Sequence, residues 1–226
     1  MKRTRRSTKW LILLLCAALF TAPALTGLAA QGKPFQVVIT SNISGMDPLR
    51  TNDRASTYVN TQMYETLYLI NREGVIEPLL AAEMPVFAED GMSVTIKLRE
   101  GVVFHDGTPF NAKAVKYTFE LIKDPDFGSA RASLAASMDS FEIMDEYTLK
   151  INLKYEDGVL LAKLAHTNSA IVSPTAQKAQ DLMVRPCGTG PYQFVSAVSG
   201  SNVVLKAFDR YWGGKPAIED VVMTII

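Results

Sequence analysis

The chain has 226 residues with 23 Lys and Arg and 23 Asp and Glu, so its formal net charge is zero. The residues after position 30 carry 18 basic and 23 acidic side chains, a net charge of about −5, which argues against a nucleic-acid partner. Their number is sufficient for a good core in one or two domains, and no internal repeat or Gly/Ser linker marks a boundary between domains.

The N-terminus has the order of a secretory signal peptide. Basic residues precede an apolar run from Trp10 to Phe20, and a small-residue region from Ala24 to Ala30 follows. We predict that residues 1–30 are cleaved near Ala30, leaving a periplasmic protein without stable membrane insertion; an uncleaved anchor is the alternative. Cys16 lacks the preceding small residue of a lipoprotein signal, so a lipoprotein is not expected. Cys187 is then the only thiol, which excludes an internal disulfide and disfavours a Cys-based zinc site.

Strand and helix patterns follow one another through the next part of the chain. Gln36–Thr40 is apolar and predicts a strand, whereas Ser41–Asp53 holds a glycine and an Asp-Pro pair and predicts a loop. Ser56–Leu69 has apolar residues at intervals of four, which predicts an amphipathic helix. Val94–Leu98 alternates apolar and polar residues, as a strand with one buried face does, and Val102–Phe104 predicts a second short strand.

A turn and a helix come next. Asp106-Gly107 is a strong turn dipeptide, and Asn111 is a good N-cap for a helix that should stop at Asp124-Pro125. Farther along, the patterns predict a hairpin at 141–153, a helix at 159–164, a helix start at 173–174, and strands at 192–194, 203–207 and 221–226.

Seven short motifs in a fixed order resemble the family 5 solute-binding proteins of peptide- and nickel-type ABC transporters. The most specific is L-R-E-G-V-V-F-H-D-G-T-P-F-N-A, residues 98–112. The other six are M-D-P (46–48), Y-E-T-L (64–67), P-L-L-A (78–81), I-V-S-P (171–174), G-T-G-P-Y (188–192) and Y-W-G-G-K-P (211–216). The resemblance covers nearly all of the chain after residue 30 and matches the N-terminal half of such proteins.

The resemblance implies a mixed α/β fold (α+β elements) of the type II periplasmic-binding-protein class. It implies that residues 31–48 and 168–226 form part of a first lobe and that residues 49–167 form an inserted α+β subdomain. We expect the second lobe to lie beyond Ile226, so that the chain is an N-terminal fragment of a two-lobed protein. A complete small domain ending on a buried strand is the alternative.

The motifs indicate structural roles more than catalysis. His105 stands beside a carboxylate, but adjacent residues at a strand end point to opposite sides, so a turn held by hydrogen bonds is expected there in place of an acid–base pair. The glycines near position 190 predict a rigid turn, because glycine adopts φ values that other residues avoid. No cofactor and no metal site is predicted. The residues given structural roles are His105, Asp106, Gly107, Gly188, Gly190, Tyr192 and Trp212.

Candidate ligand-binding residues come from the resemblance. In similar proteins the stretch just past the Asp-Pro pair enters the cleft between the lobes, which implies Asn52, Asp53 and Arg54 as ligand-binding residues. Charged and polar side chains of this kind pair well with the termini or side chains of a peptide. Arg131 and Ser133 are a second set of candidates; solvated surface is the alternative for both sets.

The favoured function is the capture of di- or oligopeptides outside the cytoplasm and their delivery to the permease subunits of an ABC importer, with no chemistry on the ligand. A binding protein for a nickel chelate or another small solute is an alternative, as is a non-functional remnant of an interrupted gene. A hydrolase centred on His105 would need a nucleophile or metal site, and none is found in the sequence.

Overall fold

The structure is a computed structural model that describes residues 33–226. The predicted signal peptide, residues 1–30, therefore lies outside the described residues. Residues 34–226 form one compact unit. Within the described residues, no helix has the length and apolar character needed to cross a membrane.

One four-stranded sheet joins the start of the described chain to its end. Its strands follow the order β1-β10-β9-β8, with β1 parallel to β10 and the other pairs antiparallel. The predicted strands are thus present, with the bounds β1 (Phe35–Ile39), β8 (Tyr192–Val198), β9 (Asn202–Ala207) and β10 (Asp220–Ile225).

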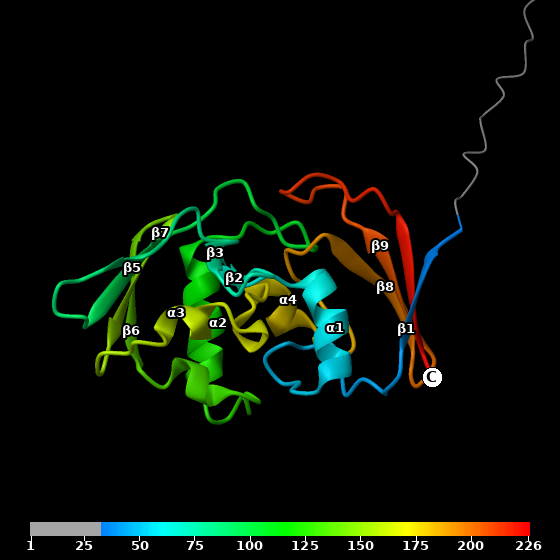
Figure 1. The fold of residues 1–226 in the computed structure, drawn as a ribbon, viewed down its shortest axis with the longest axis horizontal. Coiled ribbons are helices and arrows are strands. Elements are labelled where there is room, and N and C mark those ends of the chain that lie inside the picture. The colour runs from blue at the N-terminus through cyan, green and yellow to red at the C-terminus, as the bar shows by residue number, and fades with distance from the viewer. Residues whose placement is uncertain (1–32) are drawn as a thin grey trace, which may run out of the picture. The chain divides into compact units, whose positions relative to one another are not determined.

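A second four-stranded sheet packs against helix α2 (Ala112–Lys123). Figure 1 shows this helix beside the sheet, and the Phe119 ring of α2 stacks on Phe141 with 6.1 Å between ring centroids. Asn111 caps α2 by accepting two backbone N–H groups, and the helix ends before Asp124, as predicted. The antiparallel strands, in sheet order, are β4 (Val86–Phe87), β5 (Ser93–Lys97), β7 (Thr148–Leu153) and β6 (Met138–Asp145).

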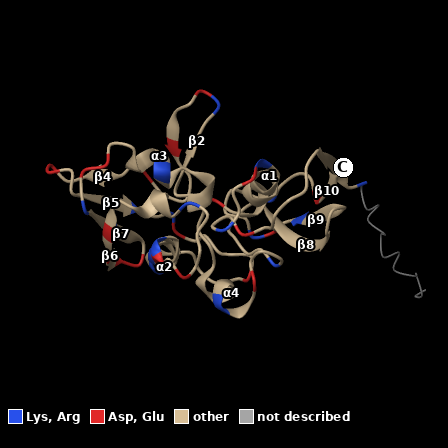
Figure 2. Ribbon diagram, turned by 90° about the horizontal axis from the view of Figure 1, so that it is seen from below, with Lys and Arg blue, Asp and Glu red and all other residues tan. Residues whose placement is uncertain are grey.

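Short elements fill the space around these sheets. Figure 1 shows α1 and α4 between the two sheets, and Figure 2 shows acidic and basic residues interspersed along the ribbon. The remaining elements are α1 (Arg54–Met63), β2 (Tyr68–Ile70), β3 (Ile76–Pro78), the 3-10 turn η1 (Ala132–Ala135), α3 (Leu160–Leu164), the 3-10 turn η2 (Thr167–Ser169) and α4 (Pro174–Ala179).

The division into a lobe and an inserted subdomain stays a prediction. The first sheet draws its strands from residues 35–39 and 192–225, and the second draws its strands from residues 86–153. Residues 34–226 nevertheless form one compact unit, so the boundaries near residues 48 and 168 are not marked by a separation in the structure.

The helix predicted at 56–69 is wrong in its second half. Helix α1 ends at Met63, and Tyr64 is already extended with φ −124° and ψ 151°. The carbonyl of Met63 accepts the Gly190 N–H at 2.9 Å, and the carbonyl of Glu65 accepts the Ile171 N–H at 2.9 Å. Both carbonyls are therefore engaged by distant segments, and the chain leaves the helix to meet them.

The short strand predicted at 102–104 is also wrong. Only one isolated bridge forms there, between Val103 and Pro109. The Phe104 N–H donates to Thr108 and the Phe110 N–H donates to Val102, which closes a tight loop around the Asp106-Gly107 turn. Proline has no N–H, so the pairing does not extend into a ladder.

Gly188 and Gly190 are required by a close approach of the backbone. A Cβ on Gly188 would overlap the carbonyl oxygen of Met63, and a Cβ on Gly190 would lie 2.7 Å from the carbonyl carbon of Met63. Neither glycine has a positive φ, so the reason predicted from the sequence, an unusual backbone angle, is wrong here. The turn at Gly107 does have a positive φ, 83°.

We predict that Gly190→Ala lowers the free energy of unfolding by about 2 kcal/mol or more, because the added methyl group must displace the end of α1. Urea denaturation measures this loss. Gly158→Ala is the matched control, since a Cβ there meets no atom within 4 Å, and its effect should stay under about 0.5 kcal/mol. Equal effects in both variants would contradict the close-approach explanation.

Candidate functional site

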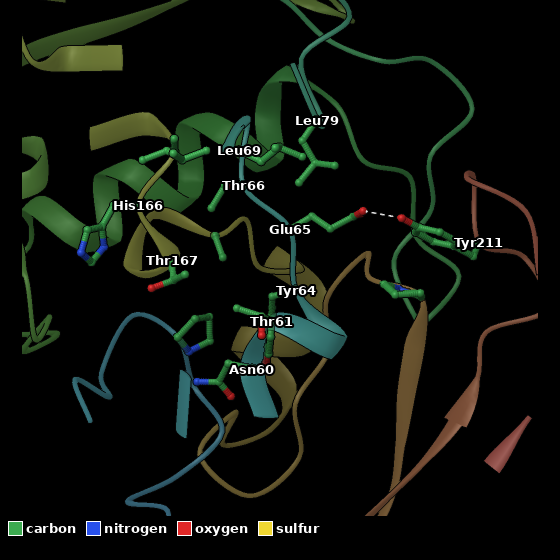
Figure 3. Close-up of a pocket in the computed structure, with 15 residues that line it drawn as sticks. Asn60, Thr61, Tyr64, Glu65, Thr66, Leu69, Leu79, His166, Thr167 and Tyr211 are labelled. Carbon is green, nitrogen blue, oxygen red and sulfur yellow. Dashed lines mark hydrogen bonds between the residues drawn. The ribbon is translucent and has the colours of Figure 1, made fainter. Parts of the chain in front are cut away.

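A cavity of about 560 Å³ opens where the end of α1 meets the segments around residues 65–70 and 165–170. Figure 3 shows His166 and Thr167 on one side of this view and the paired Glu65 and Tyr211 on the other. The residues that line the cavity are Pro48, Asn60, Thr61, Tyr64, Glu65, Thr66, Leu69, Ile70, Leu79, Ala165, His166, Thr167, Ala170, Pro191 and Tyr211.

The carboxylate of Glu65 holds three distant segments together at one end of this cavity. It accepts hydrogen bonds from Thr189 Oγ1 at 2.8 Å, Tyr211 Oη at 2.8 Å and Trp212 Nε1 at 2.9 Å. The guanidinium of Arg99 lies 4.1 Å above the Trp212 ring and so adds positive charge nearby. Three of the sequence motifs, at 64–67, 188–192 and 211–216, therefore converge on one buried carboxylate.

Burial raises the pKa of the Glu65 carboxyl above its ordinary value, while the hydrogen bonds from Trp212, Thr189 and Tyr211 oppose that rise. Both carboxylate oxygens are occupied by these donors. Glu65 therefore positions the cavity wall by tying these segments together.

Asn60, one of the residues that line the cavity, holds a buried acceptor without a partner in the described part of the chain. Its Nδ2 donates to Thr51 Oγ1 at 3.0 Å, and that hydroxyl donates its own hydrogen to the Asp47 carbonyl at 2.7 Å. The threonine hydrogen is therefore used, so the amide must present its nitrogen to Thr51. The buried Oδ1 atom of Asn60 is left with no hydrogen-bond partner among the described residues.

The structure brings together two of the residues implied as ligand-binding. Arg131 Nε donates to Asn52 Oδ1 at 3.0 Å, although 79 positions separate them in the sequence. Both side chains are exposed, and Ser133 is exposed within η1. None of the three is among the residues that line the cavity, but Asn52 follows the loop that contributes Pro48 to it.

The other two implied ligand residues lie at the start of α1. Asp53 caps this helix, because its Oδ1 accepts the Ser56 N–H at 2.7 Å and its Oδ2 accepts the Ser44 hydroxyl. Arg54 is the first residue of the helix and is exposed. Neither side chain lines the cavity.

His105 ties its turn to the glycine segment. Its Nε2 lies 2.9 Å from the Gly190 carbonyl, which only accepts, so the ring carries its hydrogen on Nε2. Nδ1 is then free to accept the Gly188 N–H, 3.4 Å away. Burial lowers the pKa of His105 to about 4, although the bond to Gly190 opposes this change. A neutral ring with both nitrogens engaged is a poor general base.

Asp106 is held by its own turn and by the start of α4. Its Oδ1 accepts the Thr108 N–H at 2.9 Å, and its Oδ2 accepts the Ser173 hydroxyl at 2.5 Å. Burial alone would raise the pKa of Asp106, but these hydrogen bonds lower it below its ordinary value. His105 and Asp106 thus bind different partners.

The sequence interpretation assigned no ligand role to several residues of the cavity. Glu65 enters the sequence analysis only as part of a family motif, and neither Asn60 nor His166 is among the candidate ligand-binding residues. The sequence does contain one signal for Glu65: this acidic residue stands between Met63-Tyr64 and Leu67-Tyr68, which are large residues of types often buried in proteins. Within residues 33–226, no cluster of three or more His, Cys, Asp or Glu side chains is arranged to hold a metal ion.

Comparison with known proteins places the chain in a family. Residues 75–226 match the bacterial extracellular solute-binding proteins, described as family 5 Middle. The chain belongs to family 5. Family members of similar sequence include the glutathione-binding protein GsiB of Pectobacterium atrosepticum, 32% identical over 216 residues, and that of Shigella flexneri, 35% identical over 208 residues. These matches cover 94% and 90% of this chain.

This family 5 chain spans about 40% of the length of the curated relatives that it matches, 41% and 40% in these two cases. Solved structures give the same picture. The binding protein AgaA of A. tumefaciens R10 with agropinic acid has a TM-score of 0.79 at 27% identity. AppA of Bacillus subtilis with a nonapeptide has a TM-score of 0.77 at 26% identity. Each match covers 85% of this chain and 40% of the other. The predicted mixed α/β fold of type II binding proteins is confirmed.

We predict that Glu65→Leu lowers the free energy of unfolding by roughly 2–3 kcal/mol, because three hydrogen-bond donors lose their acceptor inside the protein. Glu65→Gln is the matched variant: its amide oxygen still accepts from two donors, so its loss should be about 1 kcal/mol or less. Denaturant titration at pH 7 checks both values. A smaller loss for the leucine variant than for the glutamine variant would show that the carboxylate does not hold the segments together.

We predict that stability falls as the pH is lowered from 6.5 to about 4, in part because of His105. Its folded-state pKa is depressed, so its contribution is present above the ordinary value of 6.5 and is lost as the pH falls through the folded value. His105→Gln removes this titration and keeps a donor for Gly190. A plot of the free energy of unfolding against pH should be flatter for the variant than for the unaltered chain across that range. Parallel plots would contradict the prediction.

At neutral pH, His105→Ala should lower the free energy of unfolding by roughly 1–2 kcal/mol, since the Gly190 carbonyl then loses its donor.

Proposed function

We propose that this chain supplies one wall of the binding site of a solute-binding protein that serves an ABC importer, and that its solute is a small peptide. Membership of family 5 supports the class of protein. The observation that carries the proposal is the open cavity of about 560 Å³, a size within the usual range for small-molecule sites. The relatives in two other bacteria are glutathione-binding proteins, which favours a short peptide as the solute.

The cavity has the mixed chemistry that a peptide requires. Leu69, Ile70 and Leu79 provide apolar surface for side chains or methylene groups. The Thr61 hydroxyl and the His166 ring add polar groups that suit the N–H and C=O groups of a peptide. This arrangement binds without reacting, and we propose that the solute is released unchanged.

The proposed function also implies where the protein acts. We expect export directed by residues 1–30, cleavage near Ala30, and docking of the loaded protein on the permease subunits of the importer. A nickel chelate or another small solute is the second candidate for the cargo, and the binding experiment separates the two.

We predict that the 226-residue chain binds reduced glutathione or short peptides saturably but weakly. If a whole binding protein reached a Kd of about 1 µM, roughly −8 kcal/mol, and this wall contributed about half of that energy, the chain alone would have a Kd near 1 mM. Titration of the ¹⁵N-labelled chain by NMR measures such weak binding. Perturbed signals should map to the cavity residues.

Thr167→Trp should block the cavity and abolish these shifts, because Thr167 lines it. Thr175→Trp is the control, since Thr175 is exposed on α4 outside the cavity lining. Saturation by nickel–histidine in place of any peptide would favour the second candidate. No saturable binding by either class would overturn the proposed function.

A further inference from the structure

One buried asparagine ties together two segments that line the cavity. Asn168 is only 6% exposed, and its Nδ2 donates to the carbonyls of Pro48 and Thr51, at 2.5 and 2.6 Å. Because carbonyl oxygens only accept, the amide must present its nitrogen to them. Within residues 33–226, neither carbonyl accepts a hydrogen bond from any other group. Both carbonyls therefore rely on this one side chain for a partner.

Both of the joined segments contribute residues to the cavity. Pro48 belongs to the loop before α1, and His166 and Thr167 directly precede Asn168 in the chain; all three line the cavity. Asn168 itself is not among the lining residues. Its backbone N–H also donates to Nδ1 of His166 at 3.1 Å, which fixes the ring of a lining residue. Asn168 thus acts on the cavity through its neighbours.

The loop before α1 is bound internally around Asp47. The Asp47 carbonyl accepts the backbone N–H groups of Arg50 and Thr51, at 3.2 and 3.0 Å. The Asp47 carboxylate accepts the Leu49 N–H at 2.9 Å and the Arg50 Nε–H at 2.8 Å. A loop with this many internal hydrogen bonds moves as one piece, so its contacts with other segments determine where it lies.

Those contacts lead to four places in the structure. Three of them are α1, residues 129–131 and residues 181–183, reached by the pairs Asn60–Thr51, Ser129–Leu49, Ala130–Leu49, Arg131–Asn52, Asp181–Arg50 and Met46–Met183. The fourth is the segment 165–170, which lines the cavity. Among the hydrogen bonds of the described residues, only those of Asn168 join the loop to this segment.

We propose that Asn168 is a positioning residue that sets the spacing between the Pro48 loop and the 165–170 wall, and through it the size of the solute that the cavity accepts. Walls that are held in place before binding favour a compact solute that touches both, because they need not be ordered when it arrives. The proposal rests on the proposed function and adds to it a basis for selection by size.

The test compares two peptides that differ only in a substituent on sulfur. Reduced glutathione is compact, and S-hexylglutathione carries the same peptide with a long alkyl chain. NMR titration of the ¹⁵N-labelled chain measures both Kd values. In Asn168→Ala the walls are free to separate, so the Kd of glutathione should rise about fivefold, the factor given by one net hydrogen bond, while that of S-hexylglutathione should rise less than about twofold.

Two further substitutions at this position refine the test. Asn168→Asp keeps the shape of the side chain but replaces the donor by an acceptor, so the ratio of the two Kd values should shift at least as far as in Asn168→Ala. Asn168→Gln keeps the donors on a longer side chain, so the ratio should shift in the same direction by a smaller factor.

Asn111→Ala is the control for a loss of stability alone. Asn111 caps α2 by accepting two backbone N–H groups and is not among the residues that line the cavity, so its loss destabilises the protein without touching the walls. This variant should bind both peptides as the unaltered chain does. A shift of the Kd ratio in Asn111→Ala as large as that in Asn168→Ala would contradict the positioning role.

The outcomes distinguish this role from the proposed function. If both Kd values change by the same factor in Asn168→Ala, or neither changes, the positioning role is wrong and the cavity still binds the peptide. If Asn168→Ala does not fold, an unchanged ratio in Asn168→Gln overturns the role equally. If neither peptide shifts any cavity signal of the unaltered chain, the proposed function fails and the positioning role fails with it. Unchanged signals from the two sheets verify that each variant is folded.

Discussion

The rest of the structure depends on the placement of one buried carboxylate. Glu65 is only 5% exposed, and a charge in such a place is stable only when donors surround it. Those donors come from Thr189, Tyr211 and Trp212, which lie 124, 146 and 147 positions away in the sequence. The segment after α1, the glycine turn before β8 and the aromatic pair after β9 are therefore fixed relative to one another by the same group.

The backbone around Glu65 shows the same constraint. The carbonyl of Met63 accepts the Gly190 N–H, and the absence of side chains at Gly188 and Gly190 lets the two backbones approach this closely. On the other side, the carbonyl of Glu65 accepts the Ile171 N–H. Because both neighbours of Tyr64 are pinned in this way, the helix stops there and the cavity wall is already ordered before a ligand arrives, which reduces the entropic cost of binding.

Local patterns predicted the local structure well. The cap at Asn111, the end of α2 at Asp124 and the hairpin of β6 and β7 each depend on residues close together in sequence, and each is present. The length of α1 was predicted wrongly, because its apolar spacing continues to Leu67 while hydrogen bonds from distant segments end the helix at Met63. Periodicity contains no information about those partners.

The residues of the candidate site depend even more on partners that are distant in the sequence, and local patterns do not indicate such partners. The resemblance implied Asn52 and Arg131 as separate candidates, and nothing in the sequence indicates that one orients the other across 79 positions. Likewise, a glutamate in a family motif indicates importance without indicating that its oxygens are already occupied. That occupancy matters for selectivity, because a free buried carboxylate would attract a cationic group, whereas the Glu65 carboxylate already accepts from three donors of the protein itself.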